Sequence, residues 1–345
     1  MFKQIRTAQH LIGFKLIFVL FIILTCPLAM SQMPSSLALL NQLGISENDR
    51  SRIHQGETIL FNVDSSGETE LTAGVIIYIP ANPHQISALI KKDGLASLDS
   101  QSISGELIPL KANISVFNNF NFSNGSYEES EFLMAIPSDH FNLSAEEYNL
   151  IKSKIAKQPF KAADIYKHIL WQRWQSYRQY GLKGIASYDR GNNTLVSPSD
   201  DLQTAALEHD LASNYFPEIF NAWYQFPNAA LPQGVEDSYT WINRLVENRP
   251  TAILTHRLII SQTQGELILA RQFYAGHTFN ANQLTIMCLP YEKGALIFYT
   301  NRNFTDQVSG FGSSVKHFIG VQMARNEVIE LLKALQKHFE PKLGQ

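Results

Sequence analysis

The sequence predicts an α+β fold in which a curved antiparallel sheet packs around a long C-terminal helix. Three observations predict it. Apolar runs rich in β-branched residues alternate with short turn segments between residues 251 and 302. An apolar stripe of helical period follows over residues 314–338. Helical patterns dominate the middle of the chain, so we expect a helical insertion at about 143–245 within a single domain spanning 32–345.

The first predicted hairpin joins residues 251–260 to residues 266–275 through a turn at 262–265. Strand neighbours two apart point the same way, and opposed residues of paired strands share a face. A tight turn therefore predicts three cross-strand pairs on one face: His256 with Arg271, Leu258 with Leu269, and Leu254 with Phe273.

A second hairpin is predicted over residues 283–302, with its reversal at the Pro- and Gly-containing segment 290–294. One of its faces is apolar and is expected to hold Leu284, Ile286, Cys288, Ala295, Ile297 and Tyr299. The segment 310–314 then reads as a loop that ends in helix N-caps. Because an antiparallel sheet must bury its apolar face, the long helix that follows is its expected cover.

Earlier segments supply further elements. A strand pair is predicted over residues 58–63 and 72–79, then a helix from Asn82 to about Lys92, and then one or two strands within 104–122. In the middle, Ser144 and Glu147 form a capping box that opens a helix. Further helices are predicted at 161–180 and 200–211, before an aromatic-rich stretch at 215–226.

The N-terminus has the pattern of an export signal. Lys3, Arg6 and Lys15 precede a short apolar core at 16–26, and small residues place cleavage after Ser31. We therefore expect a bacterial periplasmic or secreted protein with no stable membrane span after cleavage. An uncleaved N-terminal anchor is the alternative.

Charge and motif content exclude several classes of function. Beyond Ser31 the chain has 25 basic and 31 acidic residues, which argues against nucleic-acid binding. Cys288 is then the only cysteine, so no intramolecular disulfide is expected. Histidines lack metal-ligand spacing, and no nucleophile elbow, dinucleotide fingerprint or phosphate loop is present. We therefore predict no catalytic residue, no metal site and no cofactor.

Polar residues within the apolar strands form the candidate ligand site. Two long polar side chains among leucines could anchor the polar end of an apolar ligand, although the alternative is that this end of the sheet simply meets solvent. The candidate ligand-binding residues are His256, Arg271, Tyr274, His277, Tyr299 and Asn301.

The order of elements over residues 57–92 and 250–340 resembles the START-like helix-grip fold, in which a curved sheet wraps the last helix around a cavity. Three further segments stand out: Gly56-Glu57-Thr58-Ile59, residues 270–277 (ARQFYAGH), and Tyr299-Thr300-Asn301-Arg302. In these segments the chain is similar to a family of secreted bacterial proteins of unknown function. The resemblance implies a ligand cavity but no catalytic residue.

Three functions remain open. We expect a non-catalytic binding or carrier protein for an apolar or amphipathic small molecule, held between the sheet and the helix with Arg271 and His256 at its polar end. The first alternative is a hydrolase- or cyclase-like enzyme that uses His277, Tyr274 and Arg271 for acid–base chemistry. The second is an envelope interaction protein whose aromatic stretch at 215–226 forms an exposed patch.

Overall fold

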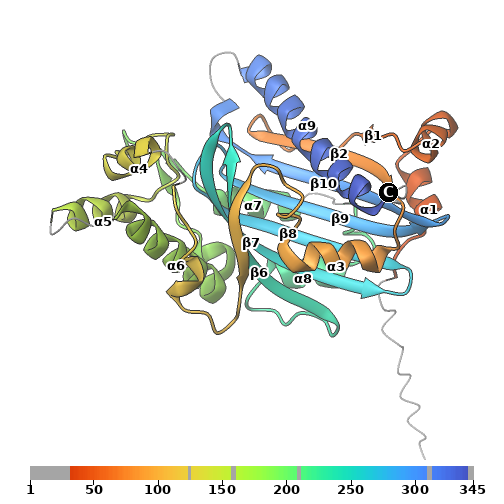
Figure 1. Cartoon of the computed structure of the whole chain (residues 1–345), viewed down its shortest axis with the longest axis horizontal. Coiled ribbons are helices and arrows are strands. Elements are labelled where there is room, and N and C mark those ends of the chain that lie inside the picture. Colours follow the sequence, from red (N-terminus) through yellow and green to blue (C-terminus); the bar gives the residue numbers. More distant parts are fainter. Residues whose placement is uncertain (1–31, 123–125, 157–160, 208–210, 309–312, 341–345) are drawn as a thin grey trace, which may run out of the picture. The chain divides into compact units, whose positions relative to one another are not determined.

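Antiparallel strands form one large sheet in the computed structural model, which describes residues 32–122, 126–156, 161–207, 211–308 and 313–340. Within these residues the sheet has eight strands in the order β1-β2-β10-β9-β8-β7-β6-β3 (Figure 1). The strands are β1 (Ile59–Phe61), β2 (Glu70–Ile79), β3 (Ser102–Ile108), β6 (Val235–Val246), β7 (Arg249–Gln262), β8 (Gly265–Ala275), β9 (Ala281–Tyr291) and β10 (Gly294–Phe304). The predicted α+β class, with an antiparallel sheet and a C-terminal helix, is confirmed.

The two predicted hairpins are present, with one change of register. His256 lies opposite Arg271, and Leu258 lies opposite Leu269, as expected. Leu254, however, pairs with Tyr274 and not with Phe273. A bulge causes the difference, because one extra residue on β8 shifts every pair beyond it by one position.

One face of the sheet, here called the helix face, packs against α9 (Ser313–Phe339) and α3 (Pro83–Asp93) (Figure 1). The side chains that α9 buries most completely are Val328, Leu332 and Leu335, all in its C-terminal half. Gly320 permits a close approach in the other half, because a Cβ there would lie 2.9 Å from Leu71. The predicted cover of the sheet by this helix is therefore confirmed, but mainly for its second half.

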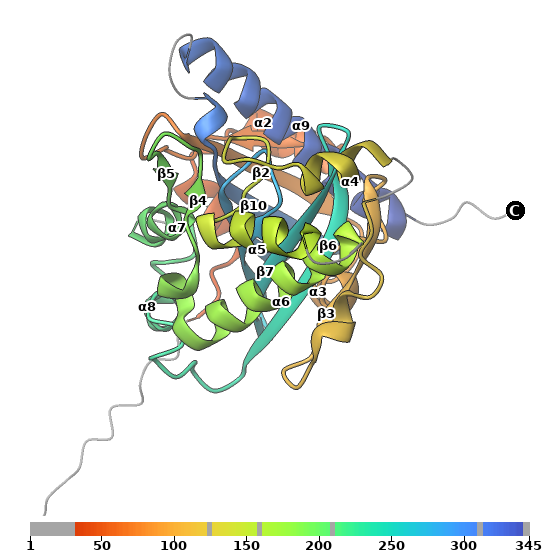
Figure 2. The same ribbon diagram turned by 90° about the vertical axis from the view of Figure 1, so that its left-hand side faces the viewer.

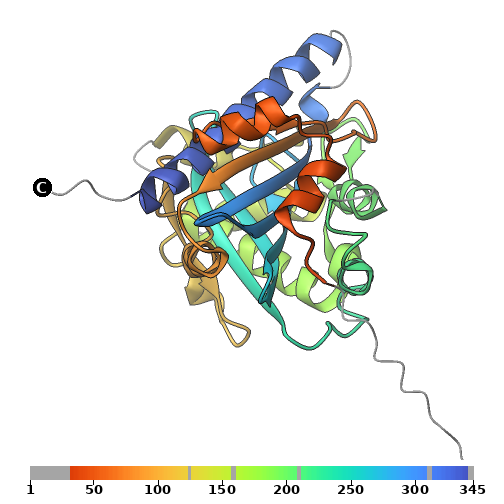
Figure 3. The same cartoon turned by 90° about the vertical axis from the view of Figure 1, so that its right-hand side faces the viewer.

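The opposite face, here called the core face, packs against helices from the N-terminal end and from the middle of the described chain (Figures 2 and 3). Its two apolar clusters contain sheet residues such as Leu254 and Tyr274 at one end and Leu258 and Leu269 at the other. The packing helices are α1 (Ser36–Gln42), α2 (Glu47–His54), α5 (Ala145–Ile155), α6 (Ala162–Tyr180), α7 (Pro198–Leu207) and α8 (Pro217–Tyr224). A shorter helix, α4 (Ser126–Leu133), packs beside α5 and α6.

Two segments differ from their predicted structure. β6 lies inside the range predicted to be a helical insertion, yet it pairs along its length with β7. Its alternating buried residues Tyr239 and Trp241 form a strand pattern, which the neighbouring aromatic stretch obscures. Residues 114–117 form the 3-10 helix η1 instead of a strand.

Some predictions fall on residues that the structure does not describe. The export signal at 1–31 and the predicted loop at 310–312 lie outside the described residues. Among the described helices, none combines the length and apolar character needed to cross a bilayer.

Candidate functional site

His256 lies at the centre of a buried hydrogen-bond chain on the core face. Its Nε2 is 2.9 Å from Asp237 Oδ1, and its Nδ1 is 2.8 Å from the Tyr177 hydroxyl. The Tyr177 oxygen also accepts a hydrogen bond of 3.2 Å from Arg271 Nη1. Burial lowers the pKa of His256, although Asp237 opposes this effect. The imidazole is therefore neutral at pH 7, where one nitrogen donates and the other accepts.

Arg271 is fully buried without a carboxylate partner among the described residues. Its Nη1 donates to the Trp223 carbonyl over 3.3 Å, and its Cζ lies 4.4 Å from the centre of the Trp223 ring. Within the part of the chain that the structure describes, its Nε and Nη2 have no hydrogen-bond partner. The predicted His256–Arg271 pair thus exists, but α6 and α8 cover it and its side chains connect these helices to the sheet.

Tyr274 and His277 form hydrogen bonds with residues outside the His256–Arg271 chain. The Tyr274 hydroxyl is 2.9 Å from the Tyr166 hydroxyl, and His277 Nε2 is 2.7 Å from Thr251 Oγ1. Burial lowers the pKa of His277 to about 3. In the described part of the chain, no hydrogen bond joins Arg271, Tyr274 and His277 to one another. The convergent acid–base cluster required by the enzyme hypothesis is therefore not formed by these three residues.

Tyr299 and Asn301 lie on the helix face, whereas His256 and Arg271 lie on the core face. The strand registers decide this, because Arg271 pairs with Gln283, which in turn pairs with Arg302. Residues 299 and 301 differ from 302 by an odd number and so point the other way. Five of the six candidates are thus divided between the two faces, with His256, Arg271 and Tyr274 on the core face, and the sixth, His277, lies in the segment after β8. A ligand under α9 would not meet the polar ends of His256 and Arg271, which corrects the expected ligand position.

The helix face also has a polar row where an apolar ligand was expected. Asn303, Asn282 and Gln272 lie opposite one another across β10, β9 and β8, and Asn301 is in the adjacent row. The side-chain carbonyl oxygen of each of the four amides is buried and accepts no hydrogen bond from the residues that the structure describes. A row of unpaired amides disfavours an apolar ligand at this end of the sheet.

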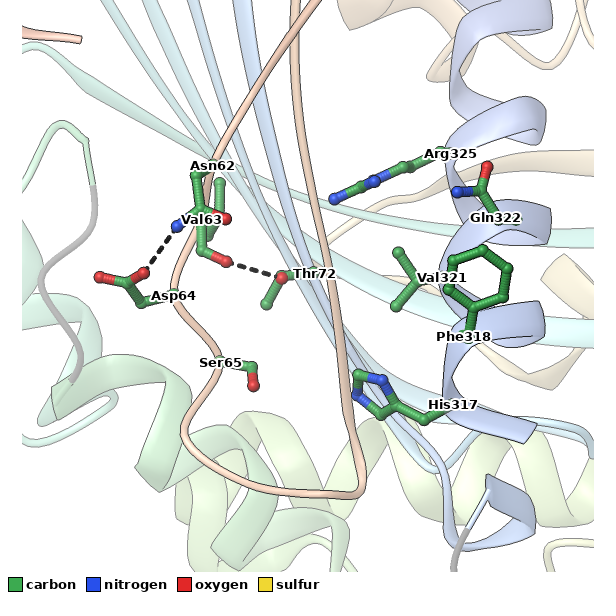
Figure 4. A pocket seen from close by; sticks show the side chains of 10 residues that line it. All are labelled: Asn62, Val63, Asp64, Ser65, Thr72, His317, Phe318, Val321, Gln322 and Arg325. Carbon is green, nitrogen blue, oxygen red and sulfur yellow. Dashed lines mark hydrogen bonds between the residues drawn. The ribbon is translucent and has the colours of Figure 1, made fainter. Parts of the chain in front are cut away.

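A different site is an open pocket between the segment after β1 and the N-terminal half of α9 (Figure 4). Its volume is about 380 Å³, near the lower end of the range for small-molecule sites, roughly 300–1,000 Å³. One wall is Phe318 and Val321 of α9. The other lining residues are Asn62, Val63, Asp64, Ser65, Thr72, His317, Gln322 and Arg325.

Arg325 is the main charged group on the α9 side of this pocket. Its side chain extends from α9 toward Asn62 and Val63 (Figure 4). Arg325 Nε is buried without a hydrogen-bond partner, and within the described residues the guanidinium has no ion pair. Asp64 lies at the far end of the pocket, where its carboxylate accepts a hydrogen bond of 2.7 Å from Asn62 Nδ2.

Neighbouring polar groups of the pocket are already partnered. His317 Nε2 donates to the Glu70 carbonyl over 2.9 Å. The side-chain carboxylate of Glu70 pairs with Arg302 at 2.6 Å. The pocket therefore combines an uncompensated guanidinium with an apolar wall, an arrangement suited to an anionic group attached to an apolar body.

An acidic cluster near α4 is the one group with metal-ligand geometry among the described residues. Ligand atoms of Glu128, Glu131 and His140 lie within 4.8 Å of one another. Arg249 Nη2, however, is 2.8 Å from Glu128 Oε1 and 3.2 Å from His140 Nε2. This guanidinium supplies the positive charge that a metal ion would bring, so the cluster is better described as an arginine-centred ion-pair network.

The aromatic stretch at 215–226 does not form an exposed patch. Phe216 and Trp223 are buried against the core face, and Tyr215, Phe220 and Phe226 are half-buried. Tyr224 is the single exposed ring of the six. The patch required by the interaction hypothesis is therefore not present in this stretch.

No protein-family model matches this chain, and neither a curated protein nor a solved structure is detectably similar to it. Function must therefore be argued from the residues themselves. Sequence reasoning missed Arg325 and His317, which lie in a helix read only for its apolar stripe. Arg325, a basic residue one helical turn beyond Val321, was only a weak signal of a pocket. The other wall of the pocket comes from residues 62–65, which are far from α9 in the sequence.

Proposed function

We propose that this protein is an exported, non-catalytic binding or carrier protein for an amphipathic small molecule with an anionic group. The uncompensated guanidinium of Arg325 is the observation that carries this proposal. A buried, unpaired nitrogen on a charged group costs free energy that an anionic ligand would recover. Phe318 and Val321 would contact the apolar part of the ligand.

The wider architecture and the N-terminal signal support the same proposal. We propose that the fold is a variant of the START-like helix-grip arrangement, since a sheet packs against a long C-terminal helix in both. The ligand would lie beside α9 at the sheet edge instead of beneath it, because the apolar cluster under the helix is filled by Val328, Leu332 and Leu335. A cleaved signal at 1–31 would place the protein in the bacterial periplasm or outside the cell.

Replacing Arg325 with glutamine is expected to weaken binding of an amphipathic anion by about ten- to a hundredfold. Titration calorimetry with decanoate measures this, and 1-decanol serves as the uncharged probe of the same chain length. Lys333→Gln is the matched control, because it removes one positive charge from an exposed position of α9 outside the pocket.

Native mass spectrometry of the protein from its own cell envelope provides a second test. A co-purifying amphipathic mass that is lost in Arg325→Gln would identify the ligand class. Equal decanoate binding by Arg325→Gln and the unmodified protein would refute the proposed site.

A further inference from the structure

The N-terminal half of α9 exposes a continuous apolar stripe. Val315 and Phe318 are each 65% exposed, Ile319 is 51% exposed and Met323 is 52% exposed. Their spacing of three and four residues places them on one side of the helix. In Figures 1 and 2 the N-terminal end of α9 projects past the sheet, while His317 and Gly320, elsewhere on this half, contact β2. Four large apolar side chains so close together are a candidate interaction surface.

The charges on this half of the helix have one sign. Residues 315–326 include the basic residues Lys316 and Arg325 but no acidic residue. The first acid, Glu327, comes after the stripe in the sequence and shares Arg244 with Asp99, at 3.0 and 2.7 Å respectively. An apolar stripe bordered by basic residues is the pattern of a helix that lies in the interface of an anionic membrane.

We propose that this stripe docks the protein on the surface of an anionic lipid bilayer, with the helix lying in the plane of the interface. The charge pattern favours this occupant over a second copy of the chain. Four half-exposed apolar side chains offer roughly 400 Å², whereas a stable protein–protein interface needs about 800 Å² from each partner. A bilayer has no such area requirement and supplies the complementary negative charge.

The two sites adjoin, because Phe318 lines the pocket and belongs to the stripe, and Arg325 lines the pocket and borders the stripe. Val315, Ile319 and Met323 do not line the pocket. Variants at these three positions therefore test the membrane surface without altering the proposed ligand site.

The test is co-sedimentation of the chain from residue 32 onward, which forms a compact unit of its own, with vesicles. The vesicles contain either phosphatidylcholine alone or phosphatidylcholine with about 30% phosphatidylglycerol, a level that gives a negative surface potential. We expect binding only to the anionic vesicles, and weaker binding at high salt. The double variant Ile319→Ser/Met323→Ser is expected to lose at least about tenfold in vesicle affinity while still binding decanoate, since removing apolar contact weakens interfacial binding.

The matched control is Met134→Ser/Ile136→Ser, which removes two exposed apolar side chains far from the stripe in sequence and should bind vesicles normally. Equal vesicle binding by the Ile319/Met323 variant and the unmodified chain would overturn the proposal. A concentration-dependent dimer in sedimentation equilibrium without lipid, abolished by the same variant, would also overturn it by assigning the stripe to a second copy. Loss of decanoate binding alone, through Arg325→Gln, leaves the membrane proposal intact.

Discussion

Replacing Arg173 with methionine is expected to lower the free energy of unfolding by about 3–5 kcal/mol. Arg173 Nε and Nη2 lie 2.7 and 2.6 Å from the two carboxylate oxygens of Glu147, and both residues are buried. Burial by itself would lower the pKa of Arg173, but the Glu147 carboxylate more than offsets this, so the pKa is raised. Without the guanidinium, Glu147 would remain as a buried charge with no ion-pair partner. Chemical denaturation with urea at pH 7.5 measures the change.

The Glu147→Leu/Arg173→Met double variant is the control. Removing both charges leaves no unpaired ion, so it should recover much of the stability that Arg173→Met loses. Part of the loss should remain, because the Arg173 guanidinium also lies 4.3 Å from the centre of the Tyr274 ring. A single variant that loses less than about 1 kcal/mol would contradict a central structural role for this pair.

Lowering the pH from 7.5 to 5 is expected to remove about 2 kcal/mol of stability through His277 alone. Burial, assisted by the nearby Arg249, holds the His277 pKa at about 3, below the ordinary histidine value of 6.5. The unfolded chain therefore takes up a proton below pH 6.5, while the folded protein does not until about pH 3. The stability that the neutral His277 contributes is fully present above pH 6.5 and is lost as the pH falls from 6.5 toward 3. The lowered pKa of His256 acts in the same direction.

His277→Gln isolates this effect, because glutamine can keep a hydrogen bond to Thr251 but does not titrate. The difference in unfolding free energy between pH 7.5 and pH 5 should be about 2 kcal/mol smaller in this variant. The comparison is needed because burial raises the pKa of Asp201 to about 6, which changes stability in the opposite direction. Identical pH profiles for the variant and the unmodified protein would show that His277 is not held neutral.

The sequence predicted the hairpins well because their information is local. A turn at residues 262–265 fixes the pairing of His256 with Arg271, and the same argument holds for the second hairpin. The bulge beside Leu254 was not predictable, since an extra residue in a strand leaves the apolar pattern nearly unchanged. As a result, Phe273 and Tyr274 both join the apolar cluster on the core face.

The candidate site was harder to predict because it depends on registers between distant segments. Whether Tyr299 shares a face with His256 depends on how β8 pairs with β9, which no local turn pattern determines. The pocket at Arg325 likewise joins residues 62–65 to the last helix. The structure buries the polar strand residues that the sequence singled out as ligand-binding candidates, and the sequence did not assign their covering helices to either face of the sheet.

The buried thiol of Cys288 has a practical consequence for following the motions of the sheet. Cys288 is fully buried in β9, opposite Ile297, and burial raises the pKa of its thiol. Residues 32–345 contain no other cysteine. Because only an exposed thiolate reacts with an aromatic disulfide reagent, labelling requires β9 to separate from its covering helices. The rate of this reaction therefore reports the opening of the central sheet, without an introduced probe.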